Sequence, residues 1–134
     1  MPKINHLAIV VEDIPKALAF WHDALGLPIG KTERNEREEV DIAFLPLASG
    51  DIELISPINQ TSGVAKFLSR NGQGVHHVCI EVDDIEAMMR RLSEHGVMLL
   101  SDKPRTNEEG TRYCFIHPKS ASGLLVELYE LAKP

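Results

Sequence analysis

Two histidines and two glutamates occupy matching places in the two halves of this sequence. His6 opens a run of β-forming residues, and His77 opens a similar run 71 positions later. Glu53 and Glu127 each interrupt a short apolar run near the end of their half. A charged side chain in an apolar strand is costly unless something compensates it. Two imidazoles and two carboxylates suit an octahedral divalent ion, with two positions left for substrate. The repetition therefore predicts a metal site made by these four residues.

The same residue types have ordinary explanations when each is taken alone. A single histidine at the start of a strand is more often a surface or hydrogen-bonding residue, and a single glutamate in a strand usually faces solvent. The occurrence of both types at duplicated positions favours a ligand set. The remaining histidines have no counterpart in the repeat and are predicted not to be ligands: His22, His76, His95 and His117.

The segments that must position these residues repeat as well. After each run of β-formers, an acidic residue and an isoleucine open a stretch with helical apolar spacing that ends at glycine. Helices are predicted over 14–25 and 85–92, with Asp13 and Asp84 as N-caps. Their apolar stripes, which include Trp21 and Met89, are expected to pack in the core.

Two further pairs of β-forming segments match, 42–46 with 113–118 and 52–55 with 126–129. Each half therefore reads as strand, helix and three strands, and a small helix near 64–70 is predicted to link the halves. A long period that occurs only twice indicates two fused modules and not a solenoid. The predicted fold class is α+β, with duplicated βαβββ modules at about 1–60 and 74–134 in a single domain of 134 residues.

Charge and composition narrow the partners. The formal net charge of −6 argues against nucleic acid, and no apolar run is long enough to cross a membrane. The mixed-charge stretch 33–39 is predicted to be a solvated loop. Cys79 and Cys114 lie in apolar strand-like runs, which favours buried thiols in a reducing cytoplasm over a disulfide. The start of the chain lacks the apolar stretch of a signal peptide.

Nearly the whole chain resembles the vicinal oxygen chelate superfamily, whose paired βαβββ modules form one domain around this metal arrangement. Within that superfamily, it is similar to the methylmalonyl-CoA epimerase family. The similarity is carried by 5–9, by 63–68 with 74–78, and by 115–119 with 123–128. The double histidine at 76–77 and the His-Pro-Lys run at 117–119 are fairly specific to the epimerases. The four ligands are not, because glyoxalase I shares them.

The resemblance implies an isomerase that interconverts the 2R and 2S forms of methylmalonyl-CoA through a metal-stabilised enolate. It assigns the metal ligands to the four duplicated residues and one proton-transferring base to Glu127. The second base of some members is a glutamate at the position of Asp41, and Glu39, on the same face of that strand, is the alternative. The implied cofactor is one divalent ion, Co, Mn, Ni, Zn or Fe, which the sequence does not distinguish.

The resemblance also implies an acyl-CoA substrate and a homodimer. A CoA tail requires cations on this acidic chain, and the predicted contacts are Lys66, Lys103, Arg105 and Lys119. The loop 104–110 is acidic where epimerases are commonly glycine-rich, which leaves the exact acyl group open. Three alternatives share the fold: a glyoxalase I-type lactoylglutathione lyase, a non-enzymatic small-molecule-binding protein, and a ring-cleaving Fe(II) dioxygenase.

Overall fold

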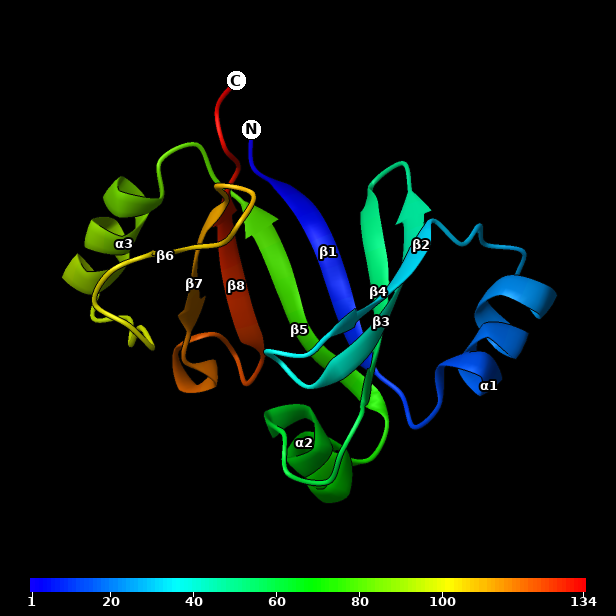
Figure 1. The fold of residues 1–134 in the computed structure, drawn as a ribbon. Helices are drawn as coiled ribbons and strands as arrows, with labels where there is room; N and C mark the ends of the chain where they lie inside the picture. The colour runs from blue at the N-terminus through cyan, green and yellow to red at the C-terminus, as the bar shows by residue number, and fades with distance from the viewer. The chain divides into compact units, whose positions relative to one another are not determined.

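The computed structural model describes residues 1–134, and the chain divides into two compact units. The N-terminal unit is His6–His76, and the C-terminal unit is His77–Pro134 together with Met1–Asn5. Each unit combines strands with helices, so the α+β prediction is confirmed (Figure 1). The single-domain boundary stays a prediction. No helix is both long enough and apolar enough to span a membrane.

The N-terminal unit follows the order strand, helix, three strands, helix. Its strands pair in the order β2-β3-β4-β1, and β1 runs parallel to β4 while the other pairs are antiparallel. The elements are β1 (Lys3–Val10), α1 (Ile14–Leu18), a π-helical turn (Ala19–Ala24), β2 (Lys31–Asn35), β3 (Val40–Leu47), β4 (Gly50–Pro57) and α2 (Gly63–Asn71). The α2 helix confirms the predicted linking helix.

The C-terminal unit repeats the pattern. Its strands pair in the order β5-β8-β7-β6, again with the first strand parallel to the last one of the module. The elements are β5 (Gly74–Glu81), α3 (Ile85–Glu94), β6 (Arg105–Thr106), β7 (Arg112–Ile116), a 3₁₀ turn (Pro118–Ser120) and β8 (Leu125–Glu130). The start of β1 belongs to this unit, where Lys3 and Asn5 contact Glu81 at 3.3 and 3.0 Å.

One face of each unit's strands packs against its own helix. In the N-terminal unit, Leu45 and Leu54 are fully buried and pack with Trp21 and other residues of the first helical segment. In the C-terminal unit, Met89 of α3 packs with Cys114 and its neighbours. The predicted core role of both helical stripes is confirmed. Because α1 and α3 fill these faces with apolar contacts, a polar site is expected on the opposite faces. In the N-terminal unit, α2 covers part of that opposite face, where Val64 packs against the cluster of Ala8, Ile42 and Ile55.

The helix starts were predicted well, and one helix end was not. Asp13 and Asp84 cap their helices as expected, each accepting a hydrogen bond from a backbone N–H three residues later. The predicted helix over 14–25 widens after Leu18 into a π-helical turn, in which the Leu25 N–H donates to the Phe20 carbonyl at 2.8 Å. A π-turn advances by i→i+5 hydrogen bonds, which apolar spacing over so short a segment does not distinguish from an α-helix.

The prediction of a solvated loop over 33–39 is wrong for its first part. Residues 33–35 belong to β2, and only 36–39 form a turn. Five residues of β2 pair with β3, and among them Arg34 lies directly across from Asp41, where opposite charges on facing positions support the pairing. The charges are solvent-exposed as expected, but they follow a sheet edge.

Candidate functional site

The first predicted ligand pair lies on adjacent parallel strands of the N-terminal unit. Ala8 of β1 is the direct partner of Glu53 in β4, so His6, two residues earlier on β1, projects on the same face as Glu53. The His6 Nδ1 atom lies 3.2 Å from a carboxylate oxygen of Glu53. His6 is only 2% exposed. The sheet therefore holds an imidazole and a carboxylate together in a largely dry setting.

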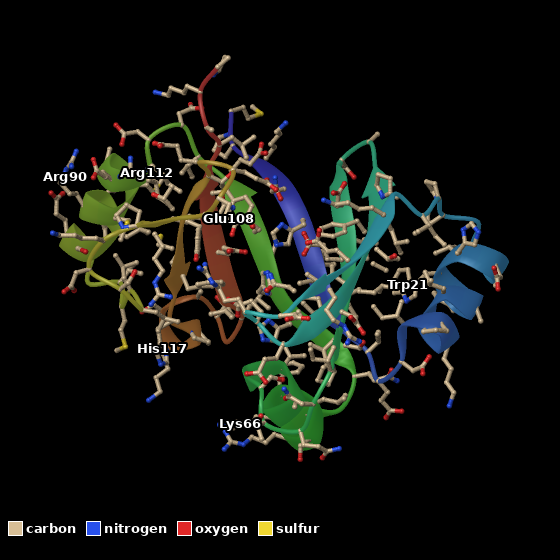
Figure 2. All side chains as sticks on the ribbon, in the orientation of Figure 1. Trp21, Lys66, Arg90, Glu108, Arg112 and His117 are labelled. Atoms are coloured by element: carbon tan, nitrogen blue, oxygen red, sulfur yellow. The ribbon has the colours of Figure 1, made fainter.

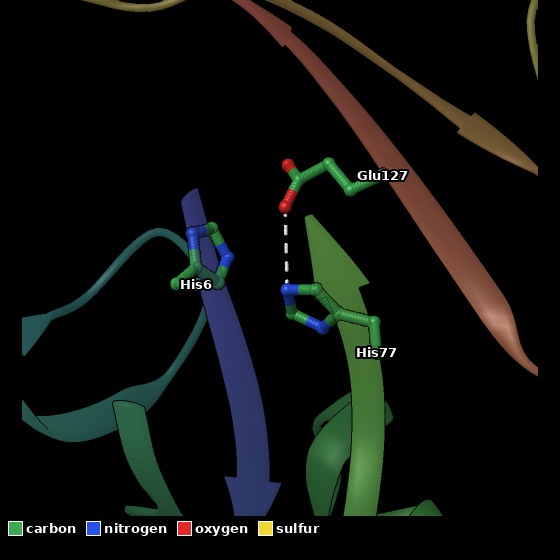
Figure 3. A group of neighbouring side chains, drawn as sticks. All are labelled: His6, His77 and Glu127. Carbon is green, nitrogen blue, oxygen red and sulfur yellow. Dashed lines mark ion pairs between the residues drawn. The ribbon is translucent and has the colours of Figure 1, made fainter. Parts of the chain in front are cut away.

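The second pair has the same construction in the C-terminal unit. Cys79 of β5 is the direct partner of Glu127 in β8, and His77 lies two residues earlier on β5. The His77 Nε2 atom is 3.2 Å from a carboxylate oxygen of Glu127, the contact drawn as a dashed line in Figure 3. Both residues are buried. The duplication seen in the sequence is thus a duplication of side-chain contacts.

Each glutamate also has an aromatic neighbour across the antiparallel strand. Phe44 of β3 is the direct partner of Glu53, and Phe115 of β7 is the direct partner of Glu127. The ring of Phe115 meets the ring of His77 edge-on, with centroids 5.9 Å apart. Apolar neighbours make an uncompensated carboxylate costly. Two carboxylates and two imidazoles in these surroundings form a donor set that fits a divalent cation.

Three of the predicted ligands, His6, His77 and Glu127, could hold a metal ion, each through one ligand atom. The fourth predicted ligand, Glu53, is paired with His6. These four side chains thus combine the nitrogen and oxygen donors that borderline transition ions accept.

The other histidines have contacts that explain them without a metal. The Nδ1 atom of His22 lies 2.6 Å from the backbone carbonyl oxygen of Leu27, just after its helical segment, and that of His95 lies 2.8 Å from the carbonyl oxygen of Arg91 in α3. His117 accepts a backbone hydrogen bond at the start of the 3₁₀ turn. His76 meets the ring of Phe67 edge-on, with centroids 5.0 Å apart.

Asp41 lies on the wrong face of β3 for its predicted role as the second base. Side chains alternate along a strand, and Phe44 shares a face with Glu53, so Ile42 does too. Asp41 belongs with Ala43 and Leu45 on the opposite face, the one covered by the first helix. Strand alternation therefore argues against Asp41 as the second base. Simple alternation from Phe44 would have revealed this placement.

Contacts of both predicted second bases point to structural roles. Arg34 donates two hydrogen bonds to the Asp41 carboxylate, at 2.8 and 3.1 Å. These hydrogen bonds lower the pKa of Asp41, which makes it a weaker base. The alternative, Glu39, does not lie in the strand: it sits in the preceding turn with a φ of 59°, and its carboxylate accepts a hydrogen bond from the Asn59 amide.

Two acids that sequence reasoning did not select do share the face of Glu53. Asp51 precedes Glu53 by two residues on β4, and Glu33 of β2 is the direct partner of Ile42. Glu33 also lies 3.6 Å from the Lys31 ammonium group. Alternation along β4 was the signal for Asp51. No comparable signal existed for Glu33, because its placement depends on the β2–β3 register.

The four cations predicted to contact CoA fall in different settings. Lys66 lies on α2 in the N-terminal unit, and the other three lie in the C-terminal unit. Lys103 borders a groove of about 660 Å³ beside α3, together with three acidic residues. Arg105 lies in the two-residue strand β6, and Lys119 in the 3₁₀ turn, both exposed.

Comparisons with known proteins agree with this geometry. Residues 5–115 match the family model of the glyoxalase/bleomycin resistance protein/dioxygenase superfamily. An ethylmalonyl-CoA/methylmalonyl-CoA epimerase of Cereibacter sphaeroides is 37% identical over 96% of this chain and 98% of its own. The crystal structure of methylmalonyl-CoA epimerase from Mycobacterium tuberculosis superimposes with a TM-score of 0.84 at 36% identity, covering 98% of this chain and 89% of that one.

A further solved structure, methylmalonyl-CoA epimerase in complex with methylmalonyl-CoA and NH4+, has a TM-score of 0.86 at 32% identity and covers 98% of this chain and 96% of that one. The extent of the family match, together with the duplicated strand-helix-strand arrangement, leads to one conclusion. The chain belongs to the glyoxalase/bleomycin resistance protein/dioxygenase superfamily, the vicinal oxygen chelate proteins.

Proposed function

We propose that this protein is a metal-dependent epimerase that interconverts the 2R and 2S forms of methylmalonyl-CoA. The observation that carries the proposal is the duplicated pair of His and Glu, 3.2 Å apart in each unit, on the face opposite the one that packs against α1 or α3. Relatives with this fold and about one third sequence identity bear the name methylmalonyl-CoA epimerase, and one was solved with methylmalonyl-CoA bound.

In this proposal, His6, Glu53, His77 and Glu127 hold one divalent ion. A divalent ion bound there supplies Lewis-acid stabilisation for the negative charge that develops on the thioester oxygen. The two histidines bind in their neutral form, so that the donor set carries two negative charges from the glutamates. Phe44 and Phe115, the cross-strand partners of the glutamates, are proposed to limit water around the reacting carbon.

The proton chemistry is assigned to carboxylates of the chain. The α-carbon lies between the thioester carbonyl and the free carboxylate. Its C–H bond breaks, the proton passes to the Glu127 carboxylate, and the electron pair of the bond remains in the enolate. Inversion requires a proton to return on the other side of the enolate plane. Since Asp41 faces the helix, the second acid is proposed to be Asp51 or Glu33, which share the face of Glu53.

The finer features of the proposal are the ion, the assembly and the compartment. We propose Co, Mn, Ni, Zn or Fe as the ion, a homodimer as the assembly, and the cytoplasm as the compartment. Support for a reducing compartment comes from the burial of Cys79 in β5 and Cys114 in β7, which suits thiols in a reducing environment. Sedimentation at several protein concentrations tests the homodimer.

Exchange of the α-proton with solvent tests the reaction. In deuterated water, the protein is expected to convert one epimer of methylmalonyl-CoA into the other and to incorporate deuterium at the α-carbon. A parallel assay uses the glutathione hemithioacetal of methylglyoxal, the substrate of a lactoylglutathione lyase. Turnover of the hemithioacetal alone would overturn the epimerase assignment, and turnover of neither compound would favour a binding protein.

Metal analysis tests the ligand set without relying on activity. The wild-type protein is expected to hold about one divalent ion per chain, and His77→Ala is expected to lose most of it. His95→Ala is the matched control, because His95 contacts only its own helical segment. Stoichiometric metal in His77→Ala would contradict the proposed ligands.

A further inference from the structure

A groove of about 380 Å³ lies on the N-terminal unit between α2 and the segment that follows β4. Its polar lining includes Lys66, Arg70, Gln60 and Ser69, and its apolar lining includes Leu68. Lys66 and Arg70 are one helical turn apart on α2, so they project on the same side of that helix. Figure 2 shows Lys66 on the outer surface of α2.

The groove carries a local positive charge on a protein whose net charge is negative. The whole stretch 57–71 contains two cations and no acidic residue, although the chain carries a net charge of −6. Neither Lys66 nor Arg70 forms an ion pair, whereas Arg34 and Arg112 each bind a carboxylate. Asn59, which lines the groove, donates a hydrogen bond from its side-chain amide to the carboxylate of Glu39. Two uncompensated cations with neutral donors beside them form a binding place for phosphate groups.

We propose that this groove binds the phosphate-bearing end of the substrate's CoA, an inference that rests on the proposed function and specifies how the substrate is held. Lys66 and Arg70 donate to phosphate oxygens, and Gln60 and Ser69 supply neutral donors. The purine packs against Leu68 and the other apolar residues of the lining. Lys66 thus keeps its predicted contact with CoA, and Arg70 joins it.

The distance along the chain supports this placement. Pro57 at the end of β4 borders the groove, and Glu53 lies four residues earlier on the same strand. At a rise of about 3.3 Å per residue, β4 carries the chain roughly 13 Å from the ligand pair to the groove. The pantetheine arm of CoA separates the thioester from the phosphates by a length of this order. One substrate can therefore reach both places within the N-terminal unit.

Lys103 is a poorer site for phosphate. Its groove beside α3 is lined by two cations, Lys103 and Arg90, and by three acids, so the negative charges outnumber the positive ones and oppose an anion. The three acids are Glu86, Glu94 and Asp102. The groove beside α2 has no such acid in its lining. The linings of the two grooves therefore favour Lys66 over Lys103 as a phosphate contact, although the sequence alone does not distinguish these two lysines.

Kinetics with two substrates tests the groove. The wild-type enzyme is expected to show a Michaelis constant at least tenfold lower for methylmalonyl-CoA than for methylmalonyl-pantetheine. In the double variant Lys66→Ala/Arg70→Ala this ratio is expected to fall towards one, through a higher constant for the CoA thioester. Lys16→Ala on α1 is the control, because it removes an exposed cation of the same unit outside the groove. An unchanged ratio in the double variant would overturn the inference.

Direct binding keeps the groove testable if the proposed function fails. Free CoA and adenosine 3′,5′-bisphosphate are titrated into wild-type and variant proteins by calorimetry at low and high salt. Salt-sensitive binding that the double variant loses supports the groove even if no thioester is turned over. Binding that is equal in both proteins contradicts the groove, while epimerisation by the wild type would leave the proposed function standing.

Discussion

Side-chain direction on a single strand decides which acids can take part in proton transfer. On β3, Ile42 and Phe44 share the face of Glu53, and Asp41 points to the helix-covered side. Arg34 holds the Asp41 carboxylate in a two-pronged contact. The pair joins β2 to β3. Because it lies at an exposed edge of the sheet, this ion pair makes only a small contribution to stability.

Replacement of Asp41 is expected to leave catalysis nearly intact. Asp41→Asn should epimerise methylmalonyl-CoA within about threefold of the wild-type rate, because the carboxylate does not face the reacting side. Asp51→Asn and Glu33→Gln are the comparison variants, and the one that removes the second base should slow epimerisation by roughly 10²–10⁴-fold. Rates are followed by separation of the epimers. Loss of epimerisation in Asp41→Asn alone would show that the strand presents its other face to the substrate.

Cys114 connects burial to a measurable pH dependence. Burial in the C-terminal core, and secondly the charge of Glu127, raise the pKa of its thiol to about 11. An unfolded cysteine ionises near 8.5. As pH rises, the Cys114 thiol therefore stays protonated in the folded state after it has ionised in the unfolded state. The contribution of this thiol to the free energy of unfolding is fully present below about pH 8.5 and falls as pH rises towards 11.

Urea unfolding between pH 8 and pH 10.5 checks this expectation. The wild type should lose on the order of 2 kcal/mol of unfolding free energy to this one thiol across the range. Cys114→Ala should be less stable at pH 8, because it leaves a cavity, but its stability should fall less steeply with pH. Parallel slopes for the two proteins would contradict the assigned cause.

At the scale of elements, the helix caps are the clearest link between sequence and stability. The Asp84 carboxylate accepts the Ala87 N–H at 3.0 Å and opens α3. Asp84→Ala should cost about 1 kcal/mol of unfolding free energy. Asp83→Ala is the matched control, since Asp83 precedes the cap and is expected to cost less than about 0.5 kcal/mol. Equal losses in the two variants would mean that the charge near the helix start, and not the cap, is what matters.

Much of the element pattern could be predicted because it repeats. The strand, helix, three-strand order of both modules and the capping aspartates follow from local spacing and residue type. The direction of Asp41 was within reach of the same alternation rule. The placement of Glu33 was not, because it depends on the register between β2 and β3, which depends on pairing between segments. The π-helical turn after α1 could not be predicted either, because the apolar spacing of so short a segment fits an α-helix equally well.

At the scale of the whole molecule, duplication produces two similar ligand pairs that need not have the same role. Each pair joins a histidine in the middle of one strand to a glutamate on the parallel strand beside it, with a phenylalanine across from the glutamate. The surroundings differ in their acids. The face of Glu53 also carries Asp51 and Glu33, whereas Glu127 lies among Phe115, His77 and Cys79. In the proposed mechanism both glutamates bind the ion, and of the two only Glu127 also transfers a proton.

Matched substitutions of the two glutamates separate these roles. A glutamine keeps one oxygen donor and loses the basic carboxylate, so it preserves coordination better than it preserves proton transfer. Glu53→Gln should keep most of the bound ion and exchange the α-proton within about tenfold of wild type. Glu127→Gln should lower exchange in deuterated water by roughly 10²–10⁴-fold, the contribution of a positioned base. Metal content, measured in the same samples, distinguishes a lost base from a lost ion.

If both variants retain metal and lose exchange equally, the two glutamates act as equivalent bases. If Glu53→Gln loses exchange and Glu127→Gln does not, the removing base belongs to the N-terminal unit and the two roles are reversed.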